Sequence, residues 1–165
     1  MKHSALIAAL LLSACATHKP QPFAPVNESG RAEYASYLVE GGATLRGQAF
    51  LTQRGGGTVK AAGRKVTLDP ATSIGRDWWQ KAGKTYAFSH RSPPAEEFLK
   101  ARRSTTADAD GRFRFDKLPP GNYFVRTEVT WEVGGYNPIQ GGALGRMVTV
   151  PASGEVEVVL SEFAQ

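Results

Sequence analysis

The stretch from Thr105 to Val133, TTADADGRFRFDKLPPGNYFVRTEVTWEV, decides the fold of this chain. Apolar and polar side chains alternate along it, which is the period of β-strands with one buried face. Two turn signals divide it, Asp110-Gly111 and Leu118-Pro119-Pro120-Gly121, because each glycine tolerates the positive φ that a tight turn requires. We therefore expect three consecutive strands. Their buried face carries Phe113, Phe115, Tyr123, Val125 and Trp131.

A family pattern runs through the same stretch. A threonine precedes D-x-x-G-x-F-x-F, and L-P-P-G-x-Y-x-V follows. The matching residues are Thr106, Asp108, Gly111, Phe113, Phe115, Leu118, Pro119, Pro120, Gly121, Tyr123 and Val125. In these residues the chain resembles the carboxypeptidase regulatory-like domain, a transthyretin-like β-sandwich. The resemblance implies this fold from Gly42 to Leu160. It also implies a domain that usually accompanies enzymes, receptors or surface proteins and is not itself catalytic.

Shorter alternating segments flank this stretch. We expect further strands at 43–52, within 59–69, at 144–150 and at 155–160. Together with the central three, they give the number and spacing of strands that are typical of a sandwich. The sequence thus predicts an all-β fold, a seven- to eight-stranded transthyretin-like β-sandwich that occupies residues 41–165.

Residues 71–104 are the least sandwich-like part and read as an insertion with one or two short helices. Ser73 to Gly83 has the pattern of a short helix with a glycine stop. Ser92 to Arg103 begins with a serine cap and prolines, and its acids precede its bases, as the helix dipole favours. Tyr86 to Ser89 is a candidate strand between the two helices. Because the segment is long for a connection between strands, we expect function to lie there.

The first fourteen residues have the pattern of a lipoprotein signal peptide. Lys2 precedes an apolar run, Ala5 to Leu12, that is too short to span a bilayer. Leu12-Ser13-Ala14-Cys15 resembles the bacterial lipobox, in which the cysteine receives a diacylglycerol and becomes the acylated N-terminus. The alternative is an ordinary signal peptide that happens to contain a cysteine. The resemblance implies lipidation at Cys15, and Ala16 after it implies the outer membrane, with the domain facing the periplasm.

Residues 15–40 are expected to form the lipidated N-terminus and a tether. The part up to about Gly30 is polar and rich in proline, which favours an extended spacer. Arg31 to Glu40 is either one helical turn or an extended lead-in. Tyr34 and Tyr37 within it are expected to pack against the edge of the sandwich.

Composition and spacing argue against several kinds of site. The net charge of +5 is modest and gives little support for nucleic-acid binding. Cys15 is the single cysteine, so an intramolecular disulfide and a cysteine-based metal cluster are both excluded. Asp108 to Gly111 lacks the other ligands of a calcium loop, and His90 lacks acids at the spacing of a helical zinc site. We therefore predict no catalytic residue, no metal and no cofactor.

Aromatic and basic side chains in the insertion are the candidates for binding. An exposed tryptophan beside a tyrosine can stack on a sugar ring, and arginine is common in protein interfaces. The candidate residues are Trp78, Trp79, Tyr86, Arg102, Arg103 and Tyr136. The alternative is that both tryptophans cap an open end of the sandwich. We expect a non-catalytic lipoprotein of the cell envelope that acts as a protein-interaction or structural module; the alternative is a module that binds carbohydrate or another envelope polymer.

Overall fold

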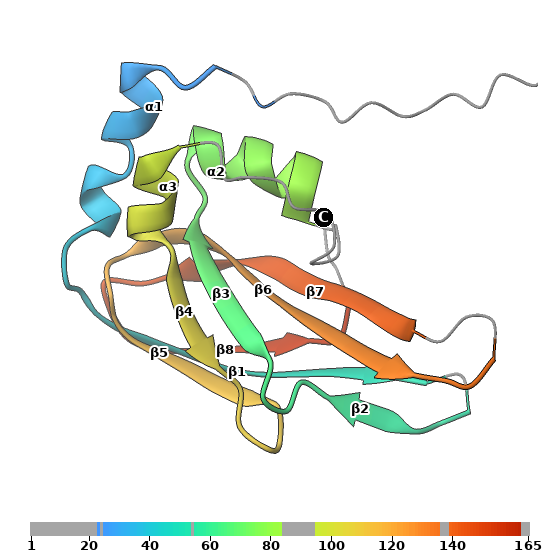
Figure 1. Ribbon diagram of the computed structural model, residues 1–165. Helices are drawn as coiled ribbons and strands as arrows, with labels where there is room; N and C mark the ends of the chain where they lie inside the picture. The colour runs from blue at the N-terminus through green and yellow to red at the C-terminus, as the bar shows by residue number, and fades with distance from the viewer. Residues whose placement is uncertain (1–22, 24, 54, 84–94, 136–138, 163–165) are drawn as a thin grey trace, which may run out of the picture.

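The computed structural model describes residues 23, 25–53, 55–83, 95–135 and 139–162. The signal peptide, Cys15, Tyr86 and Tyr136 lie outside these residues. Two four-stranded sheets form a sandwich (Figure 1), and the predicted all-β sandwich is confirmed. The strands are β1 (Gly42–Thr52), β2 (Thr58–Lys60), β3 (Lys65–Pro70), β4 (Arg103–Thr106), β5 (Arg112–Leu118), β6 (Gly121–Glu132), β7 (Ile139–Val150) and β8 (Ser153–Leu160).

The two sheets differ in how their strands run. In the first sheet, β1 pairs antiparallel with β2 and β5 and parallel with β8. The second sheet has the order β4-β3-β6-β7, and all its pairs are antiparallel. The sandwich core lies between the sheets and contains Leu45, Val66, Phe113, Tyr123 and Val125, while Trp131 is partly buried against it. The predicted core residues are therefore confirmed, with Trp131 at its margin.

Both predicted turn glycines have a positive φ. The angle is 73° at Gly111 and 154° at Gly121. Tight contacts give a second, steric reason for glycine at both positions. A Cβ added at Gly111 would lie 2.5 Å from the Ala49 carbonyl oxygen, and a Cβ added at Gly121 would lie 2.7 Å from the Tyr37 ring.

A bulge ends β5 in a way that simple alternation does not predict. Phe115 pairs with Leu45, and Leu118 pairs with Ala43. Between these two pairs β5 advances by three residues and β1 by two, so β5 contains one extra residue. Lys117 takes a φ of 55° at this place, as the extra residue of a bulge can. The bulge turns Leu118 into the core, where it is fully buried.

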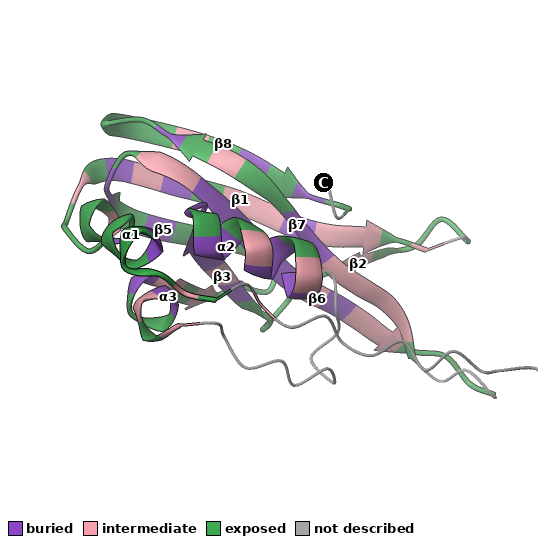
Figure 2. Cartoon of the chain, turned by 90° about the horizontal axis from the view of Figure 1, so that it is seen from above, coloured by how far each residue is buried: buried purple, intermediate pink, exposed green. Residues whose placement is uncertain are grey.

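Short helices cover the outer face of the second sheet (Figures 1 and 2). They are α1 (Glu28–Ala32), the 3₁₀-helix η1 (Ala35–Tyr37), α2 (Ser73–Trp78), the π-helix η2 (Trp79–Gly83) and α3 (Glu96–Ala101). We call them the helical layer. A second core joins the layer to the sheet, and it includes Tyr34, Ile74, Trp78, Phe98 and Phe124. Since Phe124 points away from Tyr123 and Val125, the middle of β6 is buried on both faces.

Several predicted boundaries need correction. The expected strand within 59–69 is two strands, β2 and β3. The expected tether and lead-in contain α1 and η1, and Tyr34 is buried in the second core. Helix α3 begins after Ala95, which makes no side-chain cap, and residues 103–104 belong to strand β4 and not to a helix. The candidate strand at 86–89 and the predicted cap at Ser92 lie outside the described residues.

Within the described part of the chain, no helix combines the length and the apolar character that a membrane span needs.

Candidate functional site

The two candidate tryptophans are buried in the helical layer. Trp78 is 9% exposed and Trp79 is 6% exposed. Trp79 stacks on Phe124 of β6 with ring centroids 4.5 Å apart, and Trp78 lies 5.3 Å from Phe98 of α3. The hypothesis of an exposed tryptophan is therefore wrong, because the sheet lies against one ring and α3 against the other. Both rings are buried, as the alternative expected, although the segment covers a sheet face and not an open end of the sandwich.

Arg102 has a structural role and is not an exposed tip. Its Nε lies 2.6 Å from Asp69 Oδ1 and its Nη2 lies 2.8 Å from Asp69 Oδ2. The guanidinium also lies 5.0 Å from the Trp78 ring centroid and 4.8 Å from that of Phe98. Asp69 is fully buried; burial raises its pKa, and the bonds from Arg102 oppose that rise. This pair joins β3 to the end of α3.

The other candidates do not complete a site. Arg103 donates from Nη1 to the carbonyl oxygens of Asp116 and Lys117, each at 3.2 Å, and so ties β4 to the end of β5. Tyr86 and Tyr136 lie outside the described residues. The four candidates that the structure describes, Trp78, Trp79, Arg102 and Arg103, therefore do not come together around an open surface.

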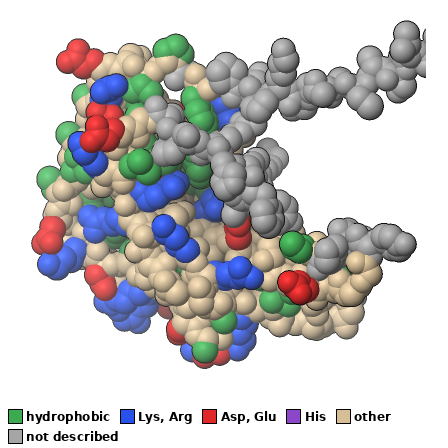
Figure 3. All heavy atoms as spheres, in the orientation of Figure 1, with side chains coloured by type: hydrophobic (Ala, Val, Ile, Leu, Met, Phe, Trp, Pro, Cys, Tyr) green, Lys and Arg blue, Asp and Glu red, His purple; other side chains and the backbone are tan. Residues whose placement is uncertain are grey.

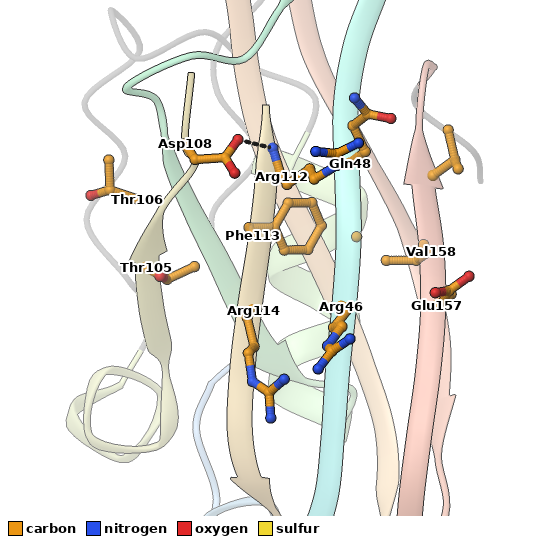
Figure 4. Close-up of a pocket in the computed structure, with 12 residues that line it drawn as sticks. Arg46, Gln48, Thr105, Thr106, Asp108, Arg112, Phe113, Arg114, Glu157 and Val158 are labelled. Atoms are coloured by element: carbon orange, nitrogen blue, oxygen red, sulfur yellow. Dashed lines mark hydrogen bonds between the residues drawn. The ribbon is translucent and has the colours of Figure 1, made fainter. Parts of the chain in front are cut away.

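A groove of about 670 Å³ lies elsewhere, on the exposed face of the first sheet (Figure 4). Strands β5, β1 and β8 form its floor, and β4 with the following turn forms one border. Its lining residues are Arg46, Gly47, Gln48, Thr105, Thr106, Asp108, Arg112, Phe113, Arg114, Glu157, Val158 and Val159. Sequence reasoning missed this groove because it explained the alternation in β5 by the buried phenylalanines alone.

Strand register places the groove's polar side chains in rows. Arg46 of β1 is directly opposite Arg114 of β5, and Glu157 of β8 is its neighbour on the other side. In the next row, Gln48 lies between Arg112 and Val159. Because residues two apart on a strand share a face, these side chains all stand on the solvent side of the sheet. Only the pairing of strands far apart in sequence brings them together.

Each arginine of the groove has an exposed acidic partner. Arg46 Nε lies 2.9 Å from Glu155 Oε2, and Arg112 Nη1 lies 3.3 Å from Asp110 Oδ2. Arg114 lies 2.6 Å from Asp116 Oδ1, and its hydrogen bond is the main reason that the pKa of Asp116 is lowered. Exposed ion pairs of this kind contribute only about 0–1 kcal/mol. The guanidinium groups can therefore exchange these partners for a ligand at little cost.

On the face seen in Figure 3, charge is not gathered into a patch of one sign. In the view of Figure 1, Lys and Arg side chains are spread over the molecule with Asp and Glu side chains between them (Figure 3). Among the described residues, no group of three or more His, Cys, Asp or Glu side chains is arranged to hold a metal ion. The groove is therefore the candidate ligand site that the described residues offer in shape and in side chains.

Comparison with solved structures gives matches that include a related protein of the same fold. A proposed carbohydrate-binding protein from Pseudomonas aeruginosa is 30% identical, with a TM-score of 0.70, and the alignment covers 86% of this chain and all of that one. The minor pilin of Streptococcus agalactiae is 13% identical with a TM-score of 0.36, covering 77% of this chain and 47% of that one. The major pilin subunit of Bacillus cereus is 9% identical with a TM-score of 0.37, covering 74% of this chain and 30% of that one.

The pilin scores are too low to carry an argument. No protein-family model matches the chain, and no curated protein matches it. The resemblance to carboxypeptidase regulatory-like domains thus stays a prediction. At 30% identity over 86% of this chain and the whole of the other, the chain belongs to the same family as the Pseudomonas aeruginosa protein.

Proposed function

We propose that this protein is a non-catalytic module that binds carbohydrate of the cell envelope through the groove on the first sheet. The observation that carries the proposal is the set of polar side chains that register gathers on this one exposed sheet face. The related Pseudomonas aeruginosa protein, itself a proposed carbohydrate-binding protein, supports it.

The chemistry of the groove suits a ligand rich in hydroxyl groups. Guanidinium groups donate several hydrogen bonds in a fixed plane, and the Gln48 amide and the threonine hydroxyls both donate and accept. Gln48 is already positioned, because its Nε2 donates to the Asp110 carbonyl oxygen at 2.8 Å. A small number of placed polar groups that fix orientation is the usual composition of a ligand site.

The same lining supports binding rather than catalysis. Its residues include no His, Cys, Ser or Lys, so the lining lacks the Ser–His and Cys–His pairs of nucleophilic catalysis. Of its two carboxylates, Asp108 already accepts the backbone N–H groups of Asp110 and Arg112 through Oδ1, each at 2.8 Å. We infer that Asp108 shapes the turn beside the groove.

Cell-envelope residence is part of the proposal. It rests on the lipobox that ends at Cys15, which implies a lipid anchor and an outer-membrane protein whose domain faces the periplasm. A lipid-anchored binding module beside envelope polymers would hold its ligand at high local concentration.

Co-sedimentation with purified envelope polysaccharide tests the function. The wild-type chain should sediment with the polymer, and Gln48→Ala combined with Arg112→Ala should remove most of that binding. Arg31→Ala combined with Lys100→Ala is the matched control, because both side chains lie on the helical layer in exposed ion pairs. Equal binding by both double variants, or no sedimentation of the wild type, would contradict the proposal.

Contact with another envelope protein is a second candidate. Leu38, Val39 and Leu99 are large apolar side chains that are exposed. The loop at Val39 adjoins the end of α3, since Arg103 Nη2 donates to the Val39 carbonyl oxygen at 3.5 Å. In-cell crosslinking from position 99 should capture a protein if this surface is an interface. Crosslinking from Lys60, on the groove's own sheet, serves as the control, and equal yields from both positions would count against the candidate.

A further inference from the structure

The groove contains a charge arrangement that the fold itself does not need. Arg46 and Arg114 are directly opposite each other on neighbouring strands. Like charges in this position destabilise a sheet, whereas opposite charges or polar pairs stabilise it. Both side chains avoid each other by bonding acids one row away, Arg46 to Glu155 and Arg114 to Asp116. An anion placed between the two guanidinium groups would remove the repulsion.

The lining favours charge recognition over ring stacking. Phe113 is the one aromatic residue among the lining residues of the groove, and its ring is buried in the sandwich core. A neutral sugar held mainly by an aromatic face therefore has no platform in this groove. Three guanidinium groups line the groove together with two carboxylates, and each guanidinium group also holds an exposed acid beside the groove, so a ligand anion would bind by replacing these acids.

Arginine is also the side chain best suited to a planar anion. Its fork of N–H donors binds a carboxylate in two parallel hydrogen bonds, which gives both strength and orientation. Figure 4 shows Arg46 and Arg114 side by side on the floor of the groove, with Gln48 and Arg112 in the next row. One carboxylate between the first pair leaves Gln48 and Arg112 to bind hydroxyl groups of the same or the next sugar.

We propose that the groove selects acidic saccharides, polymers that contain uronic acid, and holds a carboxylate between Arg46 and Arg114. This inference rests on the proposed function and adds the chemical class of the ligand. The current acidic partners, Glu155 and Asp116, are exposed, so the ligand carboxylate replaces them without leaving a buried charge unpaired.

The test compares two ligands that differ only in charge. The full-length chain, purified in detergent, is titrated with a galacturonic acid pentamer and with the same pentamer after reduction of its carboxyl groups to alcohols. We expect tighter binding of the acidic pentamer, and weaker binding as salt concentration rises, because exposed charges are screened. Arg46→Gln with Arg114→Gln should lower its affinity about tenfold or more, since charge-assisted bonds are lost.

A matched variant controls for net charge. Arg31→Gln with Arg76→Gln removes two charges from helices α1 and α2, on the second sheet, and should bind as the wild type does. Both double variants should keep the wild-type melting temperature, because exposed substitutions have small effects on stability.

The outcomes separate this inference from the proposed function. If the acidic and reduced pentamers bind equally, and the Arg46/Arg114 variant keeps both, the groove binds glycans but not through their charge, and the inference is overturned. Equal affinity for single-stranded DNA would also overturn it, because the surface would then bind any polyanion. If neither pentamer nor any envelope polysaccharide binds, the proposed function fails and this inference fails with it.

Discussion

At the scale of single residues, burial separates two kinds of arginine in this protein. Arg46, Arg112 and Arg114 hold exposed acids and can release them. Arg102 holds Asp69, whose side chain is 1% exposed while that of Arg102 is 22% exposed. Removing two charges from water costs more free energy than their mutual attraction returns, unless the geometry of the pair is good. The bidentate contact and the flanking Trp78 and Phe98 rings supply that geometry.

Because the two partners differ in burial, we expect replacement of Arg102 and replacement of Asp69 to lower stability by different amounts. Arg102→Met should cost about 3–5 kcal/mol of unfolding free energy, because it leaves the Asp69 carboxylate buried without a partner. Asp69→Asn should cost less, since Arg102 remains partly in water and keeps its contacts with the two rings. Urea denaturation at neutral pH measures both. A loss below 1 kcal/mol for Arg102→Met would show that the pair does not hold the helical layer.

The same variant should change how stability depends on pH. Burial raises the pKa of Asp69 above its ordinary value of 3.8, and without Arg102 the opposing effect is lost, so the folded-state pKa rises further. A carboxyl group whose pKa is raised on folding stabilises the fold below its unfolded pKa, and this stabilisation is lost as pH rises through its folded pKa. The difference between wild type and Arg102→Met should therefore shrink as pH falls from neutrality towards about pH 4, because both folded-state pKa values lie above the unfolded one and that of the variant is the higher. A difference that is constant across this range would contradict the assignment.

At the scale of elements, strand β6 organises the molecule because it serves two cores. Tyr123 and Val125 enter the sandwich core, and Phe124 between them enters the core of the helical layer. The helices α1, α2 and α3 are each six residues or fewer, too short to be stable alone in water. They are held by packing on β6 and by the ion pair at Asp69.

Removing an aromatic ring from one core should therefore have different consequences from removing one from the other core. Phe124→Ala and Phe115→Ala should each cost about 3–5 kcal/mol, as large core truncations do. Phe124→Ala should raise hydrogen exchange mainly in residues 73–83, because Trp79 loses its stacking partner. Phe115→Ala should raise exchange throughout the sandwich. Binding in the groove should persist in folded Phe124→Ala protein, and its loss would mean that the helical layer takes part in binding.

At the scale of the whole molecule, the sandwich has one covered outer face and one open face. The helical layer covers the second sheet, and the first sheet carries the groove (Figures 1 and 4). The three arginines of the groove are thus on the face opposite the helices. The described part of the insertion packs on the second sheet, and the binding site that we propose lies on the open sheet instead.

Membrane attachment is the prediction that belongs to the whole molecule. Cys15→Ala should release the protein from the membrane fraction or leave an uncleaved precursor, because the acceptor of the lipid is gone. Cell fractionation and mass spectrometry of the mature N-terminus measure this. The released protein should melt as the wild type does, since Cys15 precedes the packed residues. Identical fractionation of wild type and variant, with no lipid on the N-terminus, would disprove the anchor.

The sequence alone determined the properties that are local to a stretch of chain. Alternation predicted β5 and β6 and the side of each that enters the sandwich core, and turn chemistry predicted the positive φ of Gly111 and Gly121. These predictions hold because side-chain period and backbone sterics act between near neighbours. The bulge at Lys117 is a local feature that alternation missed, since the two-residue period contains no signal for an extra residue.

Tertiary structure decided everything that depends on partners far apart in the chain. It paired β8 with β1 in parallel, buried Trp78 and Trp79 under the helical layer, and joined Asp69 to Arg102. It also placed Arg46 opposite Arg114, 68 positions along the chain. The side-chain alternation within either strand does not specify that register, because the register is set by the packing of both strands onto the common core. The groove exists only in the folded molecule for this reason.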